Sequence, residues 1–248
     1  MSPYLAEFVG TTILVLLGNG VVANVLLTKT KGHDGGWIVI TFGWGLAVAV
    51  AVYSVARISG AHINPAVTVS LASIGSFEWT KVPGYILAQM AGGIFGSFLV
   101  YLTYLAHWKE TEDPALKLAC HSTAPAIRKF GPAFLTEAIG TAMLVFGVLA
   151  FGKIALGVDT SEAAWAAVVD TWFGPILVGV IVLSIGLSLG GPTGYAINPA
   201  RDLGPRIAHA ILPIPGKGSS DWQYSWIPVL APIVGGIIGA QLFVLLRL

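Results

Sequence analysis

The chain has 248 residues, of which 55% are apolar and only 10% are Asp, Glu, Lys or Arg. Soluble domains carry about 25% charged residues and disordered chains are polar, so both classes are excluded. A net charge of +1 without a basic block argues against a nucleic-acid partner, and the single cysteine excludes a disulfide scaffold. The composition predicts a membrane protein.

Six apolar runs are long enough to cross a bilayer, which takes about 20 residues of helix. They are continuous rather than alternating, which excludes a β-barrel. The first run carries Glu7 and no basic segment precedes it, so it is not a cleaved signal peptide. The sequence therefore predicts an all-α membrane protein. The six spans cover residues 5–27, 37–56, 82–106, 132–152, 173–189 and 226–246.

Two further apolar stretches, residues 60–73 and 194–212, are too short to span, and each contains Asn-Pro-Ala. Asn is a strong helix N-cap and Pro suits the first helical position. Each stretch therefore predicts a loop followed by a short helix that begins at Pro65 or Pro199. A half-span of this kind suits a re-entrant helix, although an amphipathic surface helix fits the hydropathy equally well.

The connections between the spans differ in length and polarity. Residues 107–130 form a long polar loop, which is often functional or partly folded. Residues 162–169 read EAAWAAVV, which is compatible with a short interfacial helix. No low-complexity linker interrupts the chain, so we expect a single transmembrane domain over residues 1–248.

The two halves of the chain, roughly residues 1–106 and 131–248, resemble each other. Three motifs recur in the same order, and chance explains this poorly because the chain holds only four asparagines, two of them in these motifs. In the first half the motifs begin at Glu7, Gly60 and Gly92, and in the second half at Glu137, Gly194 and Gly235.

Each half contains three predicted spans, and an odd number makes the second half enter the membrane from the opposite side. The halves are therefore expected to be inverted repeats about an axis in the membrane plane. In that arrangement the two short helices approach the midplane from opposite faces. Their N-termini, at Asn64 and Asn198, then meet.

Paired Asn-Pro-Ala triplets in an inverted repeat resemble the major intrinsic protein family of aquaporins and glycerol facilitators. The resemblance extends from Glu7 to about Leu242. It implies an aquaporin-like fold of six transmembrane helices and two re-entrant half-helices, with one pore per subunit of a homotetramer. It also implies a passive channel rather than an enzyme.

Within the family, this sequence is similar to the glycerol facilitator branch at three of the four positions of the selectivity filter, which are Trp44, Gly186, Tyr195 and Arg201. An aromatic corner suits the CH edge of glycerol, and a guanidinium offers hydrogen-bond donors to its hydroxyls. Gly186 adds no side chain and leaves the passage wide. Tyr195 departs from the Phe usual in this branch, and its hydroxyl adds a polar atom.

The resemblance implies a channel for glycerol and small neutral polyols, with some water permeability, that excludes ions and protons. The alternative is a channel of the same fold mainly for water, urea, dihydroxyacetone or undissociated lactic acid. A secondary transporter is less favoured, although transporters also use inverted repeats and broken helices.

The two triplets are expected to form the proton barrier at the midplane. Each asparagine would present an amide N–H to the solute, and each half-helix would direct its positive dipole end there. Together with Arg201, these groups would repel cations. The residues are Asn64, Pro65, Ala66, Asn198, Pro199 and Ala200.

Four other polar residues are candidates for pore or loop support. Glu7 and Glu137 would accept hydrogen bonds from the irregular backbone of the re-entrant loops, or would form a proton relay in a transporter. His62 would line the vestibule or bond to loop backbone. Asp202 would pair with Arg206 or bond to loop backbone at the mouth.

The five histidines show no metal-ligand spacing, and no nucleophile and base form a catalytic set. We therefore expect no metal, no cofactor and no enzymatic activity. The expected partners are a small neutral solute, membrane lipid and further copies of the chain.

The distribution of basic residues conflicts with the family topology. With the N-terminus inside, the outer loops hold more Lys and Arg than the inner ones, so the positive-inside rule favours the opposite orientation. The resemblance implies that both termini are cytoplasmic, and we give it precedence because the charge rule is statistical and long loops count little. Short tails and the lack of glycosylation sequons favour a bacterial inner membrane. The outer residues are Lys29, Lys31, Lys109, Lys117, Arg128, Lys129 and Lys217, and the inner ones are Lys81, Lys153 and Arg247, with Arg57 nearby.

Overall fold

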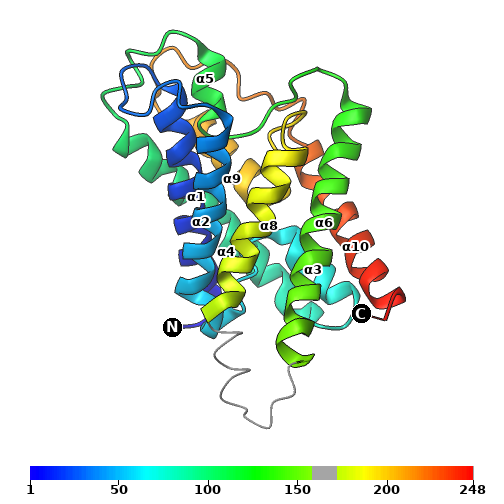
Figure 1. The fold of residues 1–248 in the computed structure, drawn as a ribbon. Coiled ribbons are helices and arrows are strands. Elements are labelled where there is room, and N and C mark those ends of the chain that lie inside the picture. Colours follow the sequence, from blue (N-terminus) through cyan, green and yellow to red (C-terminus); the bar gives the residue numbers. More distant parts are fainter. Residues whose placement is uncertain (158–171, 248) are drawn as a thin grey trace.

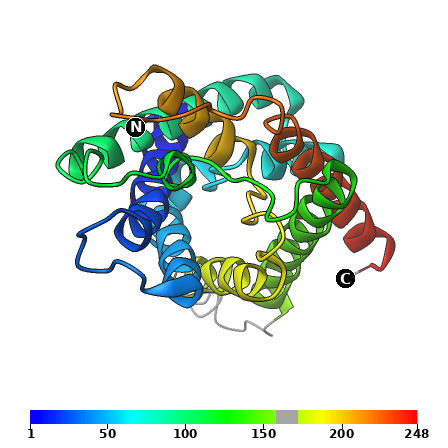
Figure 2. The same ribbon diagram turned by 90° about the horizontal axis from the view of Figure 1, so that it is seen from above.

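In the part of the chain that the structure describes, six apolar helices stand around a common centre, and Figure 2 shows this ring end-on. The computed structural model describes residues 1–157 and 172–247. Five of the helices are long and apolar enough to cross a membrane, and α8 is a shorter apolar helix of 16 residues. Five of the six predicted spans are thereby confirmed, and the sixth, predicted over residues 173–189, is the shorter apolar helix α8. The helices are α1 (Pro3–Leu26), α2 (Gly36–Ser59), α4 (Val82–Thr103), α6 (Phe130–Gly157), α8 (Gly174–Leu189) and α10 (Ile227–Leu245).

Two short helices, α3 (Pro65–Ser73) and α9 (Pro199–Ile211), lie within the bundle and begin at the prolines of the two triplets. They occupy opposite halves of the bundle and run away from its middle in opposite directions (Figure 1). Most of their residues are buried. The re-entrant half-helices are therefore confirmed, and the surface-helix alternative is wrong.

The long polar loop after α4 is partly folded, as predicted. It contains α5 (Pro114–Ala119), whose first turn is capped by the Asp113 carboxylate at 2.7 Å from the amide nitrogen of Ala115. A single 3₁₀ turn, η1 (Trp79–Lys81), precedes α4. The predicted interfacial helix over residues 162–169 lies outside the described residues. Both termini lie at the same end of the bundle (Figure 1).

Glycines bring neighbouring helices of the ring into backbone contact. A Cβ placed on Gly235 of α10 would lie 2.0 Å from the carbonyl oxygen of Ala138 in α6. A Cβ on Gly92 of α4 would lie 2.4 Å from the carbonyl oxygen of Phe8 in α1. The two repeats therefore use corresponding glycines to close corresponding helix pairs.

The outward surface of the ring is apolar on every helix. Such a surface suits lipid, because lipid tails need no polar partner. Large exposed apolar side chains include Leu17, Leu46, Phe95, Ile139, Val180 and Ile238. The ring is thus apolar where it faces outward, and buried polar residues gather around the half-helices.

Candidate functional site

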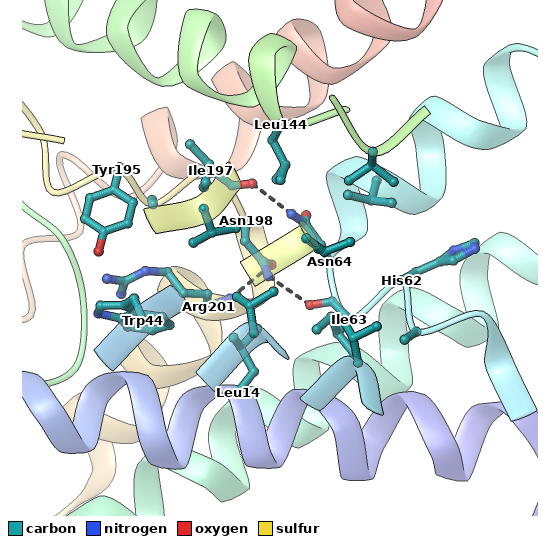
Figure 3. Close-up of a pocket in the computed structure, with 18 of the residues that line it drawn as sticks. Leu14, Trp44, His62, Ile63, Asn64, Leu144, Tyr195, Ile197, Asn198 and Arg201 are labelled. Carbon is teal, nitrogen blue, oxygen red and sulfur yellow. Dashed lines mark hydrogen bonds between the residues drawn. The ribbon is translucent and has the colours of Figure 1, made fainter. Parts of the chain in front are cut away.

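The two half-helices are joined at the middle of the molecule by reciprocal hydrogen bonds (Figure 3). The side-chain nitrogen of Asn64 donates to the carbonyl of Ile197 at 2.8 Å, and that of Asn198 donates to the carbonyl of Ile63 at 2.8 Å. Each asparagine oxygen meanwhile caps its own helix. Each asparagine amide group has two N–H bonds, so one remains for a molecule in the cavity.

The loops that lead into the half-helices share an uncommon backbone. Ile63 and Ile197 have φ of 43° and 44°, in the left-handed region that β-branched residues rarely enter. Buried carboxylates hold this conformation. Glu7 accepts from the amide nitrogens of His62 and Ile63 at 2.9 and 2.6 Å, and Glu137 accepts from those of Ala196 and Ile197 at 2.9 and 2.8 Å.

These carboxylates also fix the direction of the loop carbonyls. In a planar trans peptide the C=O and the following N–H point in opposite directions. Because the N–H groups of His62 and Ile63 point at Glu7, the carbonyls of Ala61 and His62 point away from it. The same argument turns the carbonyls of Tyr195 and Ala196 away from Glu137. Both loops line the central cavity, which therefore gains hydrogen-bond acceptors.

The cavity has a volume of about 170 Å³ and a lining of both polar and aliphatic groups. The polar part of the lining consists of the two loops with Asn64, Asn198 and Arg201. The aliphatic part of the lining comes from α1, α2, α3, α6 and α8. Its residues are Leu14, Val48, Val52, Val67, Leu71, Leu144, Val148, Val178 and Val182. A small solute that carries both hydroxyls and CH groups matches this mixed lining.

One end of the cavity, here called the aromatic end, brings together Trp44, Tyr195 and Arg201 (Figure 3). The guanidinium carbon of Arg201 lies 4.1 Å from the centroid of the Trp44 ring. Three buried polar atoms have no partner within the described chain: Trp44 Nε1, the Tyr195 hydroxyl oxygen and Arg201 Nη1. All three belong to cavity-lining residues, so the aromatic end can donate hydrogen bonds to a solute.

Glycines make room for both aromatic rings. A Cβ on Gly18 of α1 would lie 2.3 Å from Trp44 Cζ3. A Cβ on Gly186 of α8 would lie 2.8 Å from Tyr195 Cζ and 3.0 Å from its hydroxyl oxygen. Gly186 therefore lies directly against Tyr195, and any side chain at this position would displace the tyrosine ring.

His62 lies toward the opposite end of the cavity (Figure 3). Its Nδ1 is 3.0 Å from the hydroxyl oxygen of Thr68, and its ring packs against Phe77 and Tyr85 at centroid distances of 4.6 and 5.0 Å. The side chain both lines the cavity and is held by the surrounding protein.

Asp202 and Arg206 form a fully buried ion pair behind the aromatic end. Arg206 Nη2 donates to Asp202 Oδ1 at 2.8 Å, and the other carboxylate oxygen accepts from the backbone and the hydroxyl of Thr123 at 2.7 and 2.6 Å. Arg206 also donates to the carbonyls of Thr123 and Ser220. The pair thus ties two long loops to α9, one turn beyond Arg201.

Sequence reasoning missed Gly18, Thr123 and Gln89. Gln89 donates to Glu7 at 2.8 Å and to Thr68 at 3.0 Å. None of these residues belongs to a local motif, and each acts on a partner from another helix or loop. In the part of the chain that the structure describes, no three His, Cys, Asp or Glu side chains are grouped to hold a metal ion.

Comparisons with known proteins agree with this geometry. The sequence matches the major intrinsic protein family over residues 1–243. It is 63% identical over 245 residues to a probable glycerol uptake facilitator protein of Thermotoga maritima, with 98% of each chain covered. It is 51% identical over 243 residues to the glycerol uptake facilitator protein of Bacillus subtilis, covering 98% of this chain and 84% of the relative. The X-ray structure of the aquaglyceroporin from Plasmodium falciparum has a TM-score of 0.80 and 33% identity, with 97% of this chain and 93% of that chain covered. The chain belongs to the major intrinsic protein family.

Proposed function

We propose that this protein is a passive transmembrane channel for glycerol and similar small neutral polyols, with some permeability to water and none to ions or protons. The observation that carries the proposal is the cavity whose lining combines polar and aliphatic groups, with Trp44, Tyr195 and Arg201 at one end. The names of the relatives in Thermotoga maritima and Bacillus subtilis support glycerol as the solute.

The aromatic end would act as the selectivity filter. The rings of Trp44 and Tyr195 would contact the CH edge of the polyol, while Arg201 Nη1 would donate to its hydroxyls. The loop carbonyls beyond would accept from the same hydroxyls in sequence. Selectivity would then follow from width, donor and acceptor positions, and charge.

The middle of the passage would act as the barrier to protons and cations. The free amide N–H groups of Asn64 and Asn198 would donate to a passing oxygen. The half-helix dipoles place roughly half a positive charge at each N-terminus, and Arg201 adds a full charge. A neutral solute passes this positive region, whereas a cation meets an electrostatic barrier.

Several features of the assembly belong to the same proposal. The whole chain would form one channel domain, and four copies would assemble with one pore each, as family membership implies. The protein would reside in a bacterial inner membrane with both termini cytoplasmic, which agrees with its bacterial relatives and with termini at one end of the bundle. Native mass spectrometry and protease access to terminal tags test these two points.

Stopped-flow light scattering on proteoliposomes tests the main proposal. After an outward osmotic challenge with glycerol, we expect rapid shrinkage and then fast re-swelling that is linear in concentration and independent of a pH gradient. Shrinkage without re-swelling would mean that water passes and glycerol does not. Saturation with dependence on a pH gradient would indicate a transporter. Urea, dihydroxyacetone and lactic acid in the same assay rank the alternative solutes.

Variants of the aromatic end test the filter. Trp44→Ala or Tyr195→Ala should raise the permeability of a longer polyol, erythritol, relative to glycerol while water flux continues. Tyr195→Phe removes only the hydroxyl and separates its effect from that of the ring. Trp222→Ala, at a tryptophan 48% exposed in a loop, serves as the control. If neither alanine variant changes the ratio, the filter assignment is wrong.

A further inference from the structure

A second tryptophan, Trp37, lies behind Tyr195 rather than in the cavity wall. Trp37 is the second residue of α2, and its side chain is 39% exposed. Its ring meets the Tyr195 ring edge to face, with centroids 5.7 Å apart and an interplanar angle of 80°. Aromatic pairs in this geometry attract beyond simple area burial. Trp37 therefore supports the ring of Tyr195 on the side away from the passage.

Trp37 also makes a hydrogen bond that joins α2 to the end of α8. Its indole N–H donates to the carbonyl oxygen of Gly186 at 3.0 Å. Gly186 belongs to the last turn of α8, which ends at Leu189, and the last carbonyls of a helix lack partners within it. The bond therefore satisfies a carbonyl in the same turn against which Tyr195 packs.

Two glycines one turn apart form the surface on which Tyr195 rests. A Cβ on Gly190 would lie 2.5 Å from Tyr195 Cδ1 and 2.8 Å from Trp37 Cζ2, and the corresponding atom on Gly186 would lie 2.8 Å from Tyr195 Cζ. Tyr195 is thus held between α8 and Trp37. It needs this support, because its φ of 40° is strained for a residue with a side chain.

We propose that Trp37 is a positioning residue that sets the width of the selectivity filter by holding Tyr195 and the Gly186 carbonyl in place. The inference rests on the proposed function, since it concerns the same constriction. Without the indole, the Tyr195 ring has space to swing away from Arg201 and Trp44. The passage then widens and admits longer polyols.

The test measures permeability ratios in proteoliposomes. Trp37→Ala should raise the erythritol-to-glycerol permeability ratio about five-fold, the factor that one lost hydrogen bond of about 1 kcal/mol gives. Trp37→Phe keeps an aromatic edge but loses the N–H, so its ratio should lie between those of wild type and Trp37→Ala. The exposed Trp222→Ala is the matched control and should keep the wild-type ratio. If Trp37→Ala does not fold, Trp37→Phe carries the test.

A double variant shows whether Trp37 acts through Tyr195. Trp37→Ala combined with Tyr195→Ala should give the ratio of Tyr195→Ala alone, because the group that Trp37 holds is gone. A double variant whose ratio is the product of the two single effects would overturn the inference. So would a Tyr195→Ala ratio that rises while both Trp37 variants keep the wild-type ratio. If Tyr195→Ala itself leaves the ratio unchanged, the filter assignment fails instead.

Discussion

Arg201 carries a buried positive charge, and its position in an apolar helix bundle needs a physical reason. Its side chain is buried in the aromatic end of the cavity, over the ring of Trp44, and one terminal nitrogen has no partner in the described chain. A buried charge in a membrane protein is costly unless it faces a polar path or a partner. The position is understandable if Arg201 faces a passage for polar solutes.

Arg201→Val should therefore let protons leak through the channel. A unit charge at about 4 Å contributes about 4 kcal/mol at an effective dielectric constant of 20, so we expect at least a ten-fold rise in proton conductance. A pH-sensitive dye inside proteoliposomes measures this rate. Arg128→Val is the control, because Arg128 is an exposed loop residue paired with Asp221. Equal leak rates in the two variants would remove Arg201 from the barrier.

For single residues, the sequence predicts those that belong to motifs and misses those that support them. Trp44, Tyr195 and Arg201 come from two helices and a loop, and the structure places all three at one end of the cavity. Trp37 and Gly18 carry no motif. Their importance depends on contacts with Gly186 and Trp44 across helix boundaries, and hydropathy contains no information about such contacts.

The close packing of the helices depends on glycine, which has no side chain, at a few positions. Gly235→Ala would place a methyl group 2.0 Å from the Ala138 carbonyl oxygen, so α10 would have to move away from α6. We expect a loss of about 1–3 kcal/mol, which is typical of overpacking, measured as a lower thermal midpoint in detergent. Gly20→Ala is the matched control, because nothing lies within 4 Å of its added Cβ. A Gly235→Ala protein as stable as Gly20→Ala would contradict this interpretation.

The ends of helices show where hydropathy stops being informative. The predicted second span ended at residue 56, whereas α2 continues to Ser59. Arg57 lowers the local hydropathy, but the backbone stays helical until Gly60, whose left-handed φ of 81° ends the helix. The half-helices, in contrast, begin at the predicted prolines, because an Asn cap followed by Pro is a local signal.

The whole molecule should lose stability in mild acid, and His121 is one reason. His121 lies in the loop after α5, fully buried and stacked on Trp108 at 5.4 Å. Burial, together with nearby His209 and Lys217, lowers the pKa of His121 to about 3 from 6.5. Between these values the unfolded chain binds a proton that the folded protein does not. Stability from this site is complete above pH 6.5 and falls by about 1.4 kcal/mol per pH unit below it.

Thermal midpoints in detergent at pH 7.5, 6.5 and 5.5 measure this slope. His121→Gln should make this slope shallower, because the glutamine cannot titrate. His33→Gln, at an exposed loop position, should leave the slope unchanged. An equal slope in wild type and His121→Gln would show that other groups cause the acid sensitivity.

The two reciprocal hydrogen bonds of Asn64 and Asn198 at the centre of the molecule have a consequence for the direction in which the solute moves. Each asparagine holds a carbonyl of the other repeat, so neither repeat can shift without breaking both bonds. We expect such a cross-connection in a passive channel, through which the solute moves in either direction. What enters along a gradient can leave along the reverse one. Retention of the solute in the cell therefore depends on a later chemical reaction. If that reaction adds a charged group, the aliphatic lining of the channel cannot solvate the product. The product then cannot leave through the channel.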